Sequence, residues 1–382
     1  MLQTYVQSPN GRTRAAAREQ RQAGPSTAAA RAECKSEAAH GVSDVRNLYT
    51  EALDETRGQL MKRAVIGSVV TFCFLMATSS FAAADDVVFS SDAGNFIVFG
   101  GLSLANIKAQ EFVYGDEEEC TGADSKCSQL NWQSKGVTLF TLGADAQIDN
   151  DWSLKGNVSL GVGGNGHMVD TDWEVPGHDD WSHRSIHPHA KLDHYVAGAI
   201  ELDRIIYSNE TSSFSVGAGF RYTDVKWTDY GGSGIYSSKH GFRDQPVAWP
   251  DGARGISYRQ KIPVGFLSLG GKQALGNLTI SGGLLGGLSL GIRGIDDHWT
   301  RQFRAYDDMD PAPTIGATVG VNYALTPGAS LYLSGSCERV FQQLGKSQEQ
   351  NTVDGTRSAW EKDVTGANFE SMSVSFGLKG SF

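Results

Sequence analysis

Two short motifs hold the residue types that could activate a water molecule. Asp170 and Asp172 stand two residues apart in one motif, and Asp296 and His298 stand two apart in the other. A neutral imidazole held by a carboxylate can take a proton from water, so His298 is the candidate general base and Asp296 the group that orients it. Asp170 and Asp172 could hold the water from the opposite side and share one proton, because adjacent carboxylates disfavour double ionisation. The alternative is that both motifs are solvated acidic loops or calcium ligands.

The segments that precede both motifs alternate between apolar and polar residues. From Leu278 to Ile292 the even positions are leucine, isoleucine or glycine, while the odd positions are mostly small or polar. The same period of two recurs from Trp152 and again from Ser371 to Phe382. A period of two indicates β-strands with one apolar and one polar face. A soluble β-sandwich shares this pattern, so alternation alone does not distinguish a sandwich from a barrel.

The lengths of the connections favour the barrel. Ten strands are expected near 95–114, 129–147, 152–167, 191–206, 213–227, 255–269, 277–293, 314–325, 329–341 and 370–382. Five long connections, near 115–128, 168–190, 228–254, 294–313 and 342–369, alternate with short turns. Bacterial outer-membrane barrels keep long loops outside the cell and short turns in the periplasm. We therefore predict an all-β fold, a ten-stranded antiparallel transmembrane β-barrel with long extracellular loops and with both motifs at its outer rim.

The first 84 residues are expected to lie outside this barrel. Met61-Lys62-Arg63, an apolar run over 64–77 and the small residues before Asp85 match a Sec-type signal peptide over 61–84. Residues 1–60 are rich in alanine and arginine and lack hydrophobic periodicity, which indicates a disordered or mis-annotated upstream extension. A cytoplasmic N-terminal domain is the alternative. The barrel domain is then 85–382, exported to the bacterial outer membrane.

Strict alternation raises a question about which way the two motifs face. If the parity of the strands continued unchanged, both motifs would point to the same side as the lipid-facing residues. They can face the barrel mouth only if the register shifts before them. The glycine-rich segment 163–166, and Gly291 with Gly294, are places where a β-bulge could make that shift. We predict one such shift before each motif.

Cys120 and Cys127 bracket a short polar segment. In an oxidising compartment they could form a local disulfide, and the alternative is two free thiols. Neither cysteine has a suitable base beside it in the sequence, and no serine lies in a Gly-x-Ser-x-Gly motif. Covalent nucleophilic catalysis therefore has little support.

Six of the nine histidines fall between His167 and His194. Imidazole is a common zinc ligand, so this cluster could form a zinc site. However, the sequence contains no His-Glu-x-x-His motif, and no helix is expected in this region. The pattern favours a polar, solvated loop, and no metal site or cofactor is predicted.

Five short stretches occur in a distinctive order along the chain: Ser128–Trp132, Met168–Trp173, Ile235–Ser238, Gly241–Asp244 and Asp296–His298. In residues and in order, they resemble the omptin family of outer-membrane endopeptidases. The resemblance implies a ten-stranded barrel in which an Asp–His dyad and an Asp–Asp couple flank an attacking water. By motif, the dyad is Asp296 with His298, and the couple is Asp170 with Asp172.

The resemblance also implies cleavage at basic residues, with an acidic pocket for the side chain that precedes the cleaved bond. One acid of that pocket falls on Glu111. The other would lie two residues before the dyad aspartate, where this chain has Gly294. Half of the expected negative charge is absent, so the sequence leaves open whether selection for arginine or lysine persists.

Omptins also use lipopolysaccharide for activity, which makes this lipid an expected partner. The corresponding patch on the fifth strand reads Phe220, Tyr222 and Asp224, which departs from the family's mixture of acidic and basic groups. Lys261 on the next strand keeps a basic group and is the candidate contact. A requirement for lipopolysaccharide is therefore an expectation without a full set of matching residues.

The predicted function is that of an outer-membrane endopeptidase whose active site faces the cell exterior. The formal net charge of −10 argues against nucleic acid and favours cationic peptides or proteins as substrates. Two alternatives use the same scaffold: an adhesin or binding barrel with weak catalysis, and a small porin. Neither binding nor diffusion requires the complete dyad and couple.

Overall fold

The computed structural model describes residues 96–382, which form antiparallel β-strands and one 3-10 turn, η3 (Ala123–Ser125). The strands are β1 (Phe96–Tyr114), β2 (Lys126–Gln147), β3 (Trp152–Val162), β4 (Asn165–Asp172), β5 (His183–His187), β6 (Lys191–Ser208), β7 (Ser212–Ser238), β8 (Gly241–Leu275), β9 (Leu278–Ser289), β10 (Arg293–His298), β11 (Phe303–Met309), β12 (Ala312–Thr326), β13 (Ala329–Asn351) and β14 (Glu361–Ser381). In this part of the chain, no helix is long and apolar enough to cross a membrane. The predicted extension (1–60) and signal peptide (61–84) lie outside the described residues.

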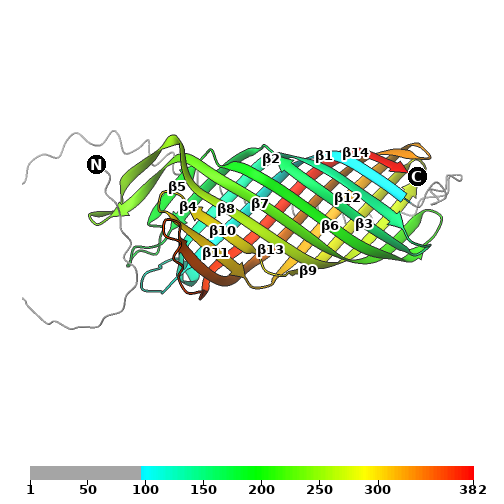
Figure 1. Cartoon of the computed structure of the whole chain (residues 1–382). Helices are drawn as coiled ribbons and strands as arrows, with labels where there is room; N and C mark the ends of the chain where they lie inside the picture. Colours follow the sequence, from blue (N-terminus) through cyan, green and yellow to red (C-terminus); the bar gives the residue numbers. More distant parts are fainter. Residues whose placement is uncertain (1–95) are drawn as a thin grey trace, which may run out of the picture. The chain divides into compact units, whose positions relative to one another are not determined.

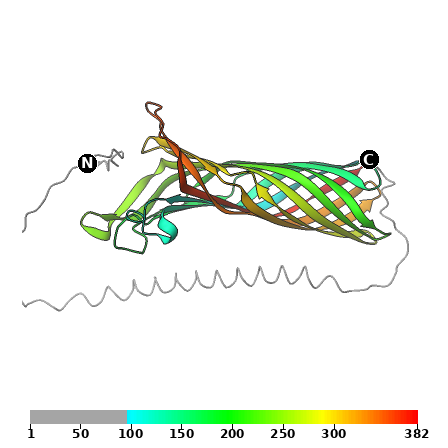
Figure 2. The ribbon, with the colours of Figure 1, turned by 90° about the horizontal axis from the view of Figure 1, so that it is seen from below.

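The sheet closes on itself through β1, which pairs with β2 on one side and with β14 on the other. Four positions around the barrel are each filled by two strands in succession: β3 and β4, β5 and β6, β9 and β10, and β11 and β12. The fourteen strands therefore occupy ten strand positions around the barrel. In Figures 1 and 2 the strands run obliquely to the barrel axis. The predicted ten-stranded antiparallel barrel is confirmed.

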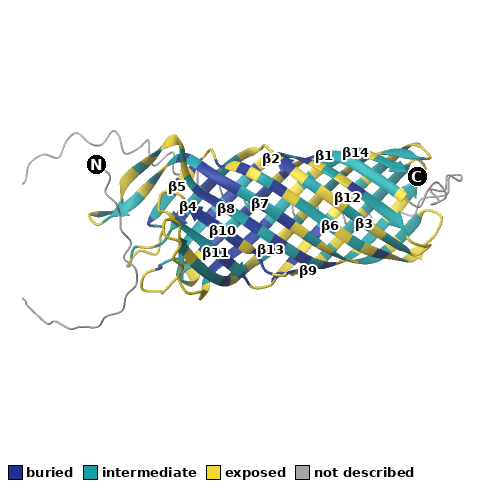
Figure 3. Ribbon diagram, in the orientation of Figure 1, coloured by how far each residue is buried: buried dark blue, intermediate teal, exposed yellow. Residues whose placement is uncertain are grey.

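Alternation places an apolar band on the outside of the barrel. Leu288 on β9 is 53% exposed, and Val374 and Phe376 on β14 are 56% and 58% exposed. Side chains of the opposite parity face the interior, where the hydroxyls of Ser103 and Ser375 share a hydrogen bond of 2.7 Å. Figure 3 shows exposed residues alternating with less exposed ones along these strands. Apolar residues facing out and polar residues facing in are what a membrane-spanning barrel requires.

The long connections are present, but most of their residues continue the strands instead of forming irregular loops. The predicted loop 228–254 belongs almost entirely to β7 and β8, which meet at a tight turn at Lys239-His240. The predicted loops 168–190 and 294–313 contain β4 and β5, and β10 and β11, respectively. These segments lack alternation because no lipid contacts their outer face, yet their backbones continue the ladders begun inside the band.

A register shift precedes the first motif, as predicted. β3 ends at Val162 and β4 begins at Asn165, with Gly163 and Gly164 between them at φ 72° and 90°. Glycine adopts such positive φ values without the clash that a Cβ would cause. The even-numbered Val162 is 54% exposed on the outer face, whereas the even-numbered Met168 is fully buried. The parity has therefore reversed, and the first motif faces inward.

A second shift precedes the other motif. Leu290 is 63% exposed and Ile292, of the same parity, is fully buried, while Gly291 between them has φ 103°. The pairing with β8 moves by one residue across this break. Gly294 takes no part in the shift, since it is paired in register inside β10. The prediction is therefore confirmed for Gly291 and wrong for Gly294.

Candidate active site

The two motifs meet at the end of the barrel that extends beyond the apolar band. Strands β4, β5, β10 and β11 lie together at this end in Figure 1, and Figure 3 shows that buried residues concentrate there. Asp170 and Asp172 lie on β4, Asp296 and His298 on β10, and Glu111 near the end of β1. All five predicted site residues therefore lie in the same extension of the barrel, outside its membrane-spanning segments.

Asp296 and His298 form a buried pair. They are two residues apart on one strand, so both side chains point to the same face, and His298 Nε2 bonds to Asp296 Oδ2. The imidazole also stacks on Phe303 of β11, with ring centroids 4.2 Å apart and 14° between the planes. Asp297 points to the other face and accepts a hydrogen bond of 2.5 Å from Arg304. Packing and pairing thus fix the orientation of the ring.

Arg301, in the turn between β10 and β11, contacts the other nitrogen of the same imidazole, Nδ1. A guanidinium only donates hydrogen bonds, so Nδ1 must accept, and in the neutral ring the proton then sits on Nε2 and is donated to Asp296. Nδ1 is therefore the basic nitrogen of His298. Arg301 was not foreseen from the sequence, because nothing in its spacing sets it apart from other loop arginines.

The Asp170 and Asp172 carboxyls face the same region from β4. Ser128 of β2 donates a hydrogen bond of 3.1 Å to Asp170. Burial raises the pKa of Asp170 against the opposing charge of Arg301. Burial, and then the charge on Asp170, raise the pKa of Asp172 well above its usual range. His298 is close enough to lower the pKa of Asp170 electrostatically, so the structure brings the couple and the dyad together.

Glu111 is 97% buried, since only 3% of its surface is exposed, and it lies among other acids. Burial, followed by the charges of Asp296 and Asp307, holds its pKa well above the usual range. Asp307 on β11 is also buried, and burial raises its pKa to about 7. Sequence reasoning missed Asp307, although it lies directly opposite Gly294, the position where an acid was expected.

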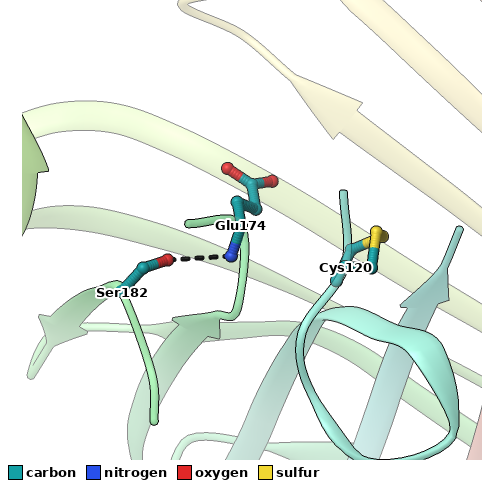
Figure 4. The surroundings of a disulfide bond; sticks show 4 residues. Cys120, Glu174 and Ser182 are labelled. Atoms are coloured by element: carbon teal, nitrogen blue, oxygen red, sulfur yellow. Dashed lines mark hydrogen bonds between the residues drawn. A yellow bond between two sulfur atoms is a disulfide. The ribbon is translucent and has the colours of Figure 1, made fainter. Parts of the chain in front are cut away.

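The disulfide between Cys120 and Cys127 forms, with a Cα–Cα distance of 4.5 Å. The turn between the two cysteines lies against the segment that follows Asp172. The backbone amide of Trp173, in that segment, donates a hydrogen bond of 2.7 Å to the Cys127 carbonyl. Figure 4 shows this chain continuing to Glu174, whose amide donates to Ser182 Oγ at 2.9 Å. The cross-link thus supports the segment that follows the carboxylate couple.

The histidine-rich segment is more ordered than the solvated loop that the sequence suggested. His187 on β5 is buried, with Nε2 2.9 Å from Ser185 Oγ and Nδ1 2.5 Å from the Gly231 carbonyl. His178 stacks on Phe242, with centroids 3.9 Å apart. The His187 contacts arise from pairing of β5 with β4 and β7, which the polar sequence did not reveal. Within residues 96–382, no three or more His, Cys, Asp or Glu side chains gather as a metal site would need.

Comparisons with known proteins extend over the whole described barrel. The model of the Omptin family matches residues 93–382. Protease 7 of Escherichia coli O157:H7 is 26% identical over 334 residues, covering 84% of this chain and 100% of the relative. Plasminogen activator of Yersinia pestis is 22% identical over 325 residues, covering 85% and 100% respectively. The crystal structure of outer membrane protease OmpT from Escherichia coli has the same fold, with a TM-score of 0.69 at 23% identity, covering 78% of this chain and 100% of that one.

Proposed function

This chain belongs to the omptin family, and we propose that it is an outer-membrane endopeptidase that cleaves peptides at or near basic residues. Its named relatives include outer-membrane proteases of Escherichia coli and Shigella flexneri. The observation that supports the proposal most strongly is the convergence of Asp170, Asp172, Asp296 and His298 at one rim. Two independent register shifts are needed to turn these groups inward, and a barrel that only bound or transported molecules would not need them.

The proposed reaction begins with a water that takes the place of Arg301 at His298 Nδ1. His298 removes a proton from this water while its Nε2–H stays bonded to Asp296, and the water oxygen attacks the peptide carbonyl carbon. Asp170 and Asp172, sharing one proton, hold the water from the other side and assist the transfer. The carbon–nitrogen bond then breaks, and His298 returns its proton to the leaving amine.

The test compares His298→Ala with His240→Ala, which changes an exposed histidine in the turn between β7 and β8. Full-length protein recovered from outer membranes is incubated with lipopolysaccharide and with peptides that contain single or paired basic residues. Loss of the general base should lower kcat/KM by about 10²- to 10⁴-fold, while His240→Ala should retain activity. Absence of cleavage by the unmodified protein, or equal cleavage by His298→Ala, would contradict the proposal.

Lipopolysaccharide is the proposed lipid partner and activator. Lys261 on β8 lies opposite Asp224 of β7 and Arg293 of β10. These residues share the outward parity of the lipid-facing Leu267, just beyond the apolar band, and the Arg293 side chain is 74% exposed. Arg259, two residues before Lys261, binds Asp224 through two hydrogen bonds of 2.8 and 2.5 Å. Outward cations at this level suit the phosphate groups of a lipid headgroup.

A further inference from the structure

Asp307 occupies the space that a side chain at position 294 would fill. Gly294 and Asp307 are directly opposite each other on the antiparallel strands β10 and β11. A Cβ added to Gly294 would lie 3.0 Å from Asp307 Oδ2, 3.1 Å from its Cβ and 3.5 Å from its Cγ. Opposite residues in an antiparallel pair project to the same face, so the Asp307 carboxyl points into the site beside Gly294.

Neighbouring strands hold the Asp307 carboxyl in this position. Ser347 of β13 lies opposite Asp307, and hydrogen bonds from Ser347 and from Thr365 of β14 favour the ionised form of Asp307. Burial opposes ionisation more strongly than these hydrogen bonds favour it, and the nearby charge on Asp296 adds a smaller opposing effect. Asp307 is therefore a buried acid whose position is fixed by hydrogen bonds from β13 and β14.

Two of the buried acids in this group, Glu111 and Asp307, lack a compensating cation among residues 96–382. Oε2 of Glu111 is buried without a hydrogen-bond partner, and so is Oδ1 of Asp296. Within residues 96–382, neither Glu111 nor Asp307 takes part in an ion pair. A buried carboxylate without a partner is costly, and a cation that binds it by charge-assisted hydrogen bonds removes that cost.

We propose that Asp307 and Glu111 together form the anionic pocket for the basic side chain of the substrate, with Asp307 replacing the acid that is missing at position 294. This inference deepens the proposed peptidase function and depends on it. The pocket takes an arginine or lysine side chain, whose guanidinium or ammonium lies between the two carboxylates. Gly294 suits this arrangement, because the Cβ of a larger residue would press against the Asp307 side chain. The preference for basic residues is retained although one acid has moved to the adjacent strand.

The experiment measures the ratio of kcat/KM for two peptides that differ only at the residue before the cleaved bond, arginine in one and neutral citrulline in the other. Asp307→Asn removes the charge and keeps the shape. Asp308→Asn is the matched control, since the Asp308 side chain is 40% exposed and faces the opposite side, 3.6 Å from Arg293. The double variant Gly294→Asp with Asp307→Gly moves the carboxylate back across the same strand pair.

The arginine-to-citrulline ratio should fall about 10- to 100-fold in Asp307→Asn, mainly through a higher KM for the arginine peptide. Asp308→Asn should keep the ratio, and the double variant should restore it. An unchanged ratio in Asp307→Asn would overturn the assignment of Asp307 while leaving the peptidase function intact. Failure of the unmodified protein to cleave either peptide would instead refute the peptidase function. If Asp307→Asn does not fold, the double variant decides, and a ratio near one in that variant overturns the proposal.

Discussion

At the scale of single residues, the two carboxyls proposed to hold the attacking water, Asp170 and Asp172, lie near a cation that sequence inspection did not single out. Arg301 lowers the pKa of both Asp170 and Asp172, against the stronger effect of burial. The Ser128 hydroxyl and the imidazoles of His298 and His187 also lower the pKa of Asp170. Burial outweighs the effect of Arg301, so both carboxyl pKa values are raised, and removal of this cation would raise them further.

Arg301→Gln should therefore shift the acidic limb of the pH–activity profile to higher pH. Without the cation, both carboxyl pKa values rise, so as the pH falls the couple becomes fully protonated earlier and activity disappears sooner. The measurement is kcat/KM from pH 4 to pH 9, with Arg357→Gln, an exposed arginine beyond β13, as the control for loss of one charge. Superimposable profiles of Arg301→Gln and the unmodified protein would show that Arg301 does not set this limb.

The convergence of Asp170, Asp172, Asp296 and His298 could be predicted because they lie in contiguous motifs whose residue types and spacing have a chemical meaning. Asp307 could not, since it reaches the site through pairing of β10 with β11 and not through its sequence neighbours. Arg301 contacts His298 from the adjacent turn, but nothing in the sequence distinguishes it from other loop arginines. The glycine at 294 was a readable signal, but it indicated only that an acid was missing. Locating the replacement required knowing which residue lies opposite it.

At the scale of elements, two breaks convert lipid-facing strands into strands that present the proposed catalytic groups to the barrel interior. Alternation inside the membrane could be predicted because lipid requires an apolar outer face. Beyond the band that requirement ends, so the continuation of β7 and β8 through 228–254 was predicted as a loop. The glycine-rich breaks were predictable from a geometric conflict: without a shift, the acids would face lipid.

Gly291→Ala should disturb the position of β10 and reduce both stability and activity. Alanine is strained at φ 103°, and its Cβ would lie 2.5 Å from the Met309 carbonyl oxygen. A cost of about 1–3 kcal/mol is expected, with a loss of kcat because the dyad moves. Gly286→Ala on β9 is the control, since a Cβ there meets no atom within 4 Å. The measurements are the free energy of unfolding in urea and the rate of peptide cleavage. Equal values for Gly291→Ala and Gly286→Ala would rule out a role for the break at Gly291.

At the scale of the whole molecule, the barrel joins a lipid-embedded part to a catalytic rim, and the outward cations lie where the two parts meet. The interior of the embedded part is tied together by groups such as the Arg221–Glu338 ion pair, which links β7 to β13. The rim continues the same strands without interruption in β7, β8 and β13. The proposed binding of a lipid headgroup at this level would therefore act on the same strands that carry the candidate active site.

Replacing Lys261 and Arg293 by glutamine should weaken activation by lipopolysaccharide without preventing the barrel from folding. Each cation near an anionic membrane surface contributes about 1 kcal/mol, so the lipopolysaccharide concentration for half-maximal activity should rise roughly fivefold for one substitution and more for two. Lys239→Gln, in the turn between β7 and β8, is the control for charge.

The peptidase assay is titrated with lipopolysaccharide and, separately, with its dephosphorylated form. If both forms activate equally, the contact does not depend on phosphate. If instead lipopolysaccharide activates the double variant as well as it activates the unmodified protein, Lys261 and Arg293 are not part of the lipid contact.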